Sequence, residues 1–242
     1  MKNLLLVFTM LTSIAVSAQI IIFHPVKVPA DVNEHFLNVE LNYSKKTAQA
    51  AVDNGELQTW ALLQHTNPEP DGFNYMWVNV YKDIESATSG PGWWSNSKEV
   101  LGVDSSVLYS GFGELEMGRR YIYKQDIELP ATGAASYVIL NFTESDKVDT
   151  HIKELRKYVL PHFKKEMNDN GMIGFGVASK VTPQGKDVAT MMTYDFYDTL
   201  TNAMIHLSGG GVISGLPMDK ITNISWTMRP LMKIVDSTVP KQ

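Results

Sequence analysis

Two long segments of the chain place apolar and polar residues with the same helical period. Residues 32–55 and 148–171 can be laid over each other without a gap, 116 positions apart. In both segments apolar or bulky side chains recur at i, i+3 and i+7, the pattern of a helix that buries one face. The two stripes are Phe36, Val39, Tyr43, Thr47 and Ala51, and Ile152, Leu155, Val159, Phe163 and Met167. Each copy is therefore predicted to form one long amphipathic helix.

The ends of the two segments match as well. Each closes with Asp-Asn-Gly, so that Gly55 and Gly171 stand at equivalent places. Glycine stops a helix there because it adopts positive φ without steric cost. Pro161 interrupts the second copy, where Lys45 stands in the first, and predicts a kink.

Short apolar runs around both helices predict strands. "IIIFHPV" precedes the first helix and "SYVILNF" the second, and each helix is followed by two further runs joined by a polar turn. A less regular connection leads to "RRYIYKQDIEL" in one copy and "RPLMKIVDSTV" in the other. Each copy therefore has the order strand, helix, two strands, crossover and strand. This is the order of a ferredoxin-like βαββαβ unit. We therefore predict an α+β fold in which two fused ferredoxin-like repeats cover each other's open sheet face as a pseudo-dimeric α+β barrel.

The stretch "AVDNGELQTWALLQH…YMWVNVYKD" and its echo "MNDNGMIGFGVASKV…TMMTYDFYD" resemble the dimeric α+β barrel superfamily. This superfamily includes antibiotic-biosynthesis-type monooxygenases, NIPSNAP-like proteins and several haem-handling enzymes. The chain is most similar to uncharacterised exported bacterial members in which two units are fused. The resemblance implies the fold more than the function, because members use different residues for different chemistries.

The N-terminus has the layout of a cleavable secretory signal, with Lys2 ahead of an uncharged run from Leu4 to Val16. We expect a signal peptide at 1–18, a first repeat at 19–130 and a second at 131–242. The mature protein is then periplasmic or extracellular. The apolar runs are shorter than the roughly 20 residues needed to cross a bilayer, so no membrane span is expected.

Charge and composition exclude several function classes. The formal net charge is −5, and nucleic-acid binders rely instead on basic patches that neutralise phosphates. The absence of cysteine rules out disulfides, thiolate metal sites and a cysteine nucleophile. The histidines show no spacing typical of a metal site. We predict no metal, no cofactor and no nucleic-acid partner, and the oligomeric state stays open.

Aromatic residues give the best argument for a ligand. Alternation along residues 75–81 puts Tyr75, Trp77, Asn79 and Tyr81 on one face, and Trp60 joins it from the neighbouring strand. The matching face of the second copy is predicted to carry Met192, Tyr194 and Phe196. Such a face suits a small-molecule pocket between a sheet and its covering layer, and it also suits an ordinary core.

Ionisable residues extend the candidate site. Asp195 stands where the first copy has Val80, so it lies either in water at the sheet edge or in a pocket with a shifted pKa. His35 and His151 occupy equivalent positions in the two repeats. Pseudo-twofold symmetry could place both at the mouths of related clefts, and the alternative is that both are partly exposed structural residues. The resemblance also implies haem as an alternative, with His35, His151 or His162 as candidate axial ligands, although no local motif supports it.

These observations leave three functional hypotheses. The first is an exported soluble protein that binds a small hydrophobic or aromatic molecule through Trp60, Trp77, Asn79, Tyr194, Asp195, His35 and His151. The second is a cofactor-independent monooxygenase-like or isomerase-like enzyme of the same superfamily. The third is a protein-interaction module of the cell envelope that uses Trp93 or Trp94.

Overall fold

The computed structural model describes residues 18–110, 112–113, 115–186, 188–221 and 225–239. Nearly all of the predicted signal peptide therefore lies outside the described residues. Within the described part, no helix is both long enough and apolar enough to cross a membrane.

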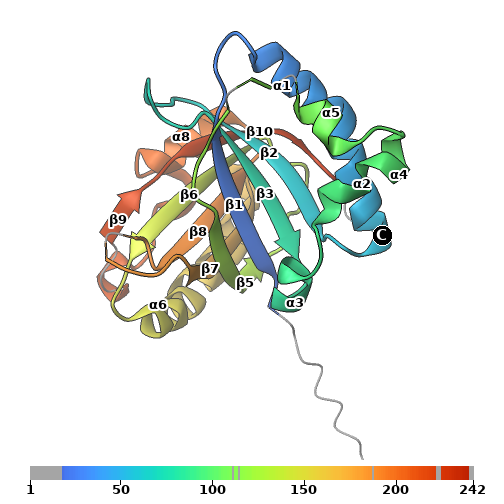
Figure 1. Ribbon diagram of the computed structural model, residues 1–242. Coiled ribbons are helices and arrows are strands. Elements are labelled where there is room, and N and C mark those ends of the chain that lie inside the picture. Colours follow the sequence, from blue (N-terminus) through green and yellow to red (C-terminus); the bar gives the residue numbers. More distant parts are fainter. Residues whose placement is uncertain (1–17, 111, 114, 187, 222–224, 240–242) are drawn as a thin grey trace, which may run out of the picture.

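Eight antiparallel strands close into a barrel at the centre of the molecule (Figure 1). Around the barrel the order is β2-β3-β1-β5-β7-β8-β6-β10, and the pairing of β10 with β2 closes the circle. Their bounds are β1 Ile20–Lys27, β2 Thr59–His65, β3 Tyr75–Tyr81, β5 Tyr121–Leu129, β6 Tyr137–Glu144, β7 Met172–Thr182, β8 Met191–Tyr197 and β10 Leu231–Ser237. Two short strands, β4 Glu116–Met117 and β9 Ser225–Met228, extend the edges of β1 and β6. The predicted α+β class is confirmed, and so is its closure into a barrel.

Helices cover the outside of the barrel on two flanks (Figure 1). One long helix lies on each half, built from α1 Asn33–Val39, η1 Glu40–Ser44 and α2 Lys45–Asn54 in the first, and from α6 Val148–Glu154, η3 Leu155–Val159 and α7 Leu160–Glu166 in the second. The crossovers carry short helices: α3 Ile84–Thr88, η2 Trp93–Asn96, α4 Ser97–Leu101 and α5 Ser105–Tyr109, and later α8 Leu200–Leu207, η5 Gly211–Ile213 and η6 Met218–Lys220. A short turn of helix, η4 Asn168–Asn170, precedes β7.

The predicted helix stops are confirmed. Gly55 has φ 80° and Gly171 has φ 65°, the left-handed conformation that glycine adopts at low cost. The amide of Gly55 donates to the carbonyl oxygen of Val52 and the amide of Glu56 to that of Ala51. These bonds satisfy carbonyl groups that the helix end leaves open.

Both long helices contain a π segment at their centre, at residues 40–44 and 155–159. The extra residue per turn rotates the following residues around the helix axis. For this reason Ser44 takes the buried position four residues after Glu40, while Tyr43, predicted to be part of the stripe, is 36% exposed. The second π segment ends two residues before Pro161, and the first forms without any proline, so a π segment at this place does not require proline.

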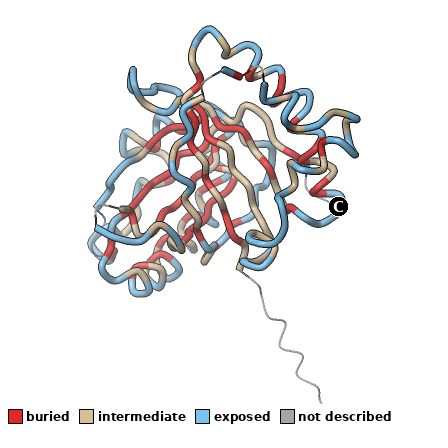
Figure 2. Tube along the Cα trace, in the orientation of Figure 1, coloured by how far each residue is buried: buried red, intermediate tan, exposed pale blue. Residues whose placement is uncertain are grey.

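Buried residues follow the strands of the barrel (Figure 2), and their apolar side chains form three cores. One fills the barrel interior and draws on strands of both halves, among them Phe23, Leu140 and Met192. The other two lie outside the barrel, each between one long helix and its half of the sheet. Each strand therefore has one face toward the interior and one toward a helix, and alternation along the strand decides which residue joins which core.

Candidate functional site

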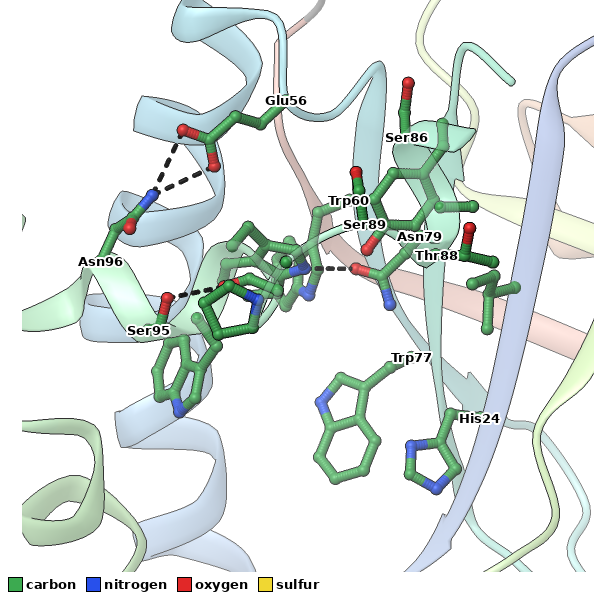
Figure 3. A pocket seen from close by; sticks show the side chains of 18 of the residues that line it. His24, Glu56, Trp60, Trp77, Asn79, Ser86, Thr88, Ser89, Ser95 and Asn96 are labelled. Carbon is green, nitrogen blue, oxygen red and sulfur yellow. Dashed lines mark hydrogen bonds between the residues drawn. The ribbon is translucent and has the colours of Figure 1, made fainter. Parts of the chain in front are cut away.

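A cleft of about 890 Å³ opens between the first half of the sheet and the segments that cover it. Outer-face residues of β1, β2 and β3 form its floor, and residues of the long helix and of the crossover from 84 to 96 form its walls (Figure 3). Four of the five tryptophans of the chain line it, which are Trp60, Trp77, Trp93 and Trp94. Clefts of this size with aromatic walls and a few polar groups are typical of small-molecule sites.

The floor is set by the pairing of three neighbouring strands. Trp60 on β2 lies opposite Asn79 on β3, and Trp77 on β3 lies opposite His24 on β1. The His24 and Trp77 rings are 5.5 Å apart between centroids and lie side by side in Figure 3. Burial and the nearby positive charge of Arg120 lower the pKa of His24, which favours a neutral imidazole.

Glu40 supplies a buried carboxyl group to the same cleft. It begins the π segment of the first helix and is 2% exposed. Burial raises the pKa of Glu40 from 4.5 to about 7, and hydrogen bonding from Trp77 and Ser44 offsets only part of that rise. Its Oε2 atom is buried without a hydrogen-bond partner among the described residues. Leaving such an oxygen unpaired is costly, so the group is suited to a partner that enters the cleft.

The crossover after β3 ties its aromatic residues to the floor. The indole Nε1 of Trp93 donates to Oδ1 of Asn79 over 2.8 Å (Figure 3). Trp94 packs edge-on against Trp93 and tilts against Tyr109, with ring centroids 5.3 and 5.1 Å apart. Both tryptophans are half-buried, and together they form one wall of the cleft.

Side-chain size on the helix explains why the first half is open and the second is not. The two π segments begin 115 residues apart. At this spacing the buried residues Glu40, Ser44 and Ala48 of the first helix correspond to Leu155, Val159 and Phe163 of the second. In the second half Phe163 packs edge-on against Phe175, with ring centroids 4.9 Å apart, and the space between helix and sheet is only about 130 Å³.

The structure brings together three of the predicted site residues and separates the rest. Trp60, Trp77 and Asn79 share the cleft. Asp195 lies on the outer face of the second half and lines the smaller cavity there. Tyr194 belongs to the barrel interior, where its hydroxyl donates to Oε1 of Gln125 over 2.9 Å.

The prediction that Tyr194 shares a face with the counterparts of Trp77 and Asn79 is therefore wrong. Asn79 pairs with Trp60, and Asp195 pairs with Phe175, another residue of the outer face. Asp195 thus corresponds to Asn79, not to Val80. A shift of one residue in the assumed equivalence moves every side chain of a strand to the opposite face.

The candidate histidines do not line either cavity. His35 is exposed and packs edge-on against Phe112, whereas His151 is buried, so the two are not equivalent in the fold. His162 places Nε2 2.8 Å from the carbonyl oxygen of Val212. These three residues do not fit the haem alternative. Across the described ranges, no three His, Cys, Asp or Glu side chains gather as a metal site would require.

Sequence reasoning missed Glu40 and His24 as residues of the site. Glu40 follows Phe36 by four residues and is next to Val39, so helical periodicity is compatible with its burial. It was passed over because a carboxyl group is not expected on a buried face. His24 sits in an apolar run that reads as a buried strand. At the 116-residue spacing of the sequence comparison Glu40 stands opposite Arg156, so both positions carry a charge and no signal marked Glu40. The contrast with Leu155 emerges only at the 115-residue spacing of the π segments.

No protein-family model matches the chain, and no curated protein matches it either. Solved structures do match. One is a putative monooxygenase from Fusobacterium nucleatum subsp. nucleatum, with TM-score 0.58, 11% identity and coverage of 92% of this chain and 94% of that one. Another putative monooxygenase, from Lactobacillus acidophilus, has TM-score 0.56, 9% identity and coverage of 92% and 97%. An anthrone oxidase-like protein has TM-score 0.54, 10% identity and coverage of 91% and 92%, and chlorite dismutases are also among the matches.

Proposed function

Because the chain has the fold of the dimeric α+β barrel superfamily, we propose that it binds a small aromatic molecule in the cleft of its first half. The buried, unpartnered Oε2 of Glu40 beside Trp77 is the observation that supports this most directly. A planar ring gains contact area against indole faces and edges. A hydroxyl or N–H group on that ring would donate to Glu40 and remove the cost of its unpaired oxygen.

The charge at the cleft narrows the ligand class. Arg120 and Lys82 line the rim, and Glu56 lines it as well, so the rim carries both signs. Deeper in, the one carboxyl is Glu40, which burial keeps largely protonated below pH 7. A neutral or weakly acidic aromatic compound such as a phenol suits this arrangement better than a strongly charged one.

The second candidate function is an enzyme of the oxygenase or isomerase type. Two observations favour it: the solved structures that match include proteins named as monooxygenases and an anthrone oxidase-like protein, and the cleft contains two ionisable side chains. These are Glu40, whose pKa burial raises to about 7, and His24, whose lowered pKa favours the neutral imidazole that can accept a proton. A general base works best when its pKa lies near the operating pH. Either group would take the proton of an acidic O–H or C–H of the substrate.

The binding experiment uses calorimetry with 1-naphthol and its methyl ether, which differ in one hydrogen-bond donor. We expect 1-naphthol to bind and the ether to bind roughly fivefold more weakly, the effect of about 1 kcal/mol for one hydrogen bond. Glu40→Gln and Trp77→Ala should each weaken 1-naphthol binding. Trp226→Phe, which changes the one tryptophan outside the cleft, is the matched control and should leave it unchanged.

Binding that neither variant alters would place the ligand elsewhere and end the proposal. Oxygen consumption measured with an oxygen electrode separates the two candidate functions. Uptake of oxygen with 1-naphthol that is lost in Glu40→Gln supports the enzyme, and tight binding without turnover supports the binding protein.

Two further features of the chain are proposals as well. We propose that it consists of two fused ferredoxin-like repeats, supported by the strand orders β5-β1-β3-β2 and β10-β6-β8-β7 of the two halves. We also propose export after cleavage behind residue 18. Intact-mass measurement of the secreted protein tests the cleavage, and co-expression of 19–130 with 131–242 as separate chains tests whether the halves associate as repeats.

A further inference from the structure

The second half contains a buried polar network on the outer face of its sheet. The side-chain amide of Asn141 donates to Oδ2 of Asp195 over 2.6 Å and to Oγ1 of Thr193 over 3.0 Å. Nε of Arg229 donates to Oδ1 of Asn141 over 2.8 Å, and its guanidinium lies over the Trp226 ring. The side chain of Asn141 thus links the carboxyl group of Asp195 to the guanidinium of Arg229, and these two groups do not hydrogen-bond to each other directly.

A second pair borders the network. The Tyr197 hydroxyl and Nδ1 of His206 are 2.6 Å apart, and Nε2 of His206 lies 3.7 Å from Oδ2 of Asp195, beyond hydrogen-bond distance. Burial and the Arg229 charge lower the pKa of His206 to about 4, so this imidazole is neutral at pH 7. Arg229, His206 and Tyr197 are the titratable or charged groups that face Asp195.

One oxygen of the network is unused. Asp195 is 2% exposed, and its Oδ1 is buried with no hydrogen-bond partner among the described residues. Asp195, Asn141, Thr193, His206 and Arg229 all line the cavity of about 130 Å³. A buried carboxyl oxygen without a partner costs free energy, which a ligand in that cavity would recover.

The rest of the cavity is apolar and reaches the surface. Its walls are Leu155, Val159, Phe163, Phe175, Ile213, Leu216 and Ile221, and its rim includes Met218 and Trp226, which are 52% and 40% exposed. An apolar cavity of roughly 150 Å³ holds benzene, so this one accommodates a molecule of about six non-hydrogen atoms. The occupant needs a polar head at one end and an alkyl body at the other.

We propose that this cavity binds a short-chain carboxylic acid, with its carboxylate between Arg229 and Oδ1 of Asp195 and its alkyl chain among Leu155, Val159 and Phe163. The guanidinium supplies charge complementarity. Asp195 supplies the proton that two neighbouring carboxyl groups share, because both cannot be ionised at that distance. This site is independent of the ligand proposed for the first cleft, because that cleft lies beside the other long helix.

The shared proton gives the proposal a distinctive pH dependence. Burial raises the pKa of Asp195 from 3.8 to about 7, and the Asn141 hydrogen bond and Arg229 oppose that rise. A free alkanoic acid is ionised above pH 6, so the complex needs the proton on Asp195. That proton is already present below pH 7 and must be taken up from solution above it. The fraction of protonated Asp195 falls about tenfold between pH 6 and pH 8, and affinity should fall by the same factor.

Calorimetry with butyrate, a carboxylate of six non-hydrogen atoms, tests the proposal, and butyramide is the uncharged comparison. We expect a Kd of about 1 mM or below at pH 6 and about tenfold weaker binding at pH 8, while butyramide shows no such change. Asp195→Asn should remove the pH dependence, and Arg229→Gln should weaken butyrate binding at least tenfold. Glu40→Gln, in the other cleft, should leave it unchanged.

Val159→Phe keeps the polar network and fills the cavity, so it should abolish binding even if Asp195→Asn fails to fold. Absence of butyrate binding at 10 mM, an affinity independent of pH, or binding that survives Val159→Phe would each overturn the proposal. If wild type binds butyrate as expected but does not bind 1-naphthol, the result contradicts only the function proposed for the first cleft.

Discussion

Replacing Glu40 by glutamine should stabilise the protein at alkaline pH and leave its stability nearly unchanged in acid. The carboxyl group ionises at a pKa of about 7 in the folded protein and 4.5 when free. Between these values the folded state binds more protons than the unfolded state, so the free energy of unfolding falls as pH rises through this window. The difference corresponds to about 3 kcal/mol at 1.36 kcal/mol for each pKa unit. Glutamine has the same shape and cannot ionise, so it avoids this loss.

Urea unfolding of wild type and Glu40→Gln at pH 4.5, 5.5, 6.5, 7.5 and 8.5 measures the effect. The two free energies should agree within about 1 kcal/mol at pH 4.5 and diverge to as much as about 3 kcal/mol, in favour of the variant, at pH 8.5. Comparing the proteins at the same pH cancels the titration of all other groups. Glu56→Gln removes an exposed carboxyl at the rim of the same cleft and should follow the wild-type curve.

A difference between wild type and Glu40→Gln that stays constant across this pH range would refute the reasoning. It would mean that Glu40 reaches water or a counter-charge in solution. The cleft would then lack the buried carboxyl on which its proposed preference for hydroxylated aromatic ligands depends.

The further predictions concern three glycines. Gly55→Ala should cost about 1 kcal/mol in urea unfolding, because φ is 80° and an added Cβ meets nothing within 4 Å. Gly171→Ala should cost about twice as much, since its Cβ would lie 1.9 Å from Nδ2 of Asn202, and equal costs would contradict this contact. Gly176→Ala should cost about 1–3 kcal/mol, because its Cβ would lie 2.0 Å from Cζ of Tyr194 inside the barrel. The double variant with Tyr194→Leu should regain part of that loss, and no recovery would show that backbone strain, not the ring, sets the cost.

Local patterns predicted much of the candidate site. Trp77 and Asn79 share a face because side chains alternate along a strand, and Trp60 joins them because a hairpin places its two strands side by side. Both relations depend only on residues that are close in the sequence, so they hold even where the overall arrangement of strands is predicted wrongly. They bring three of the seven predicted site residues into one cleft.

The residues that were misplaced depend on distant parts of the chain. Alternation shows that Tyr194 and Asp195 point to opposite faces, but not which face meets the barrel interior. That choice follows from the pairing of β8 with β6 and β7. Gly176 on β7 has no side chain, and the Tyr194 ring fills the place where its Cβ would be, a contact between residues of different strands.

The elements of this protein follow from the amino-acid pattern alone: two long helices with glycine stops, the hairpins and their order along the chain. These are consequences of backbone conformation and of side-chain period, which neighbouring residues dictate. Leu155 and Val159 of the second helix were already part of the predicted stripe, whereas the burial of Glu40 and Ser44 in the first helix emerged only from the packing of that helix on the sheet. Ser44 and Ala48 occupy less space than Val159 and Phe163, and for this reason a cleft of about 890 Å³ lies in one half and a cavity of about 130 Å³ in the other.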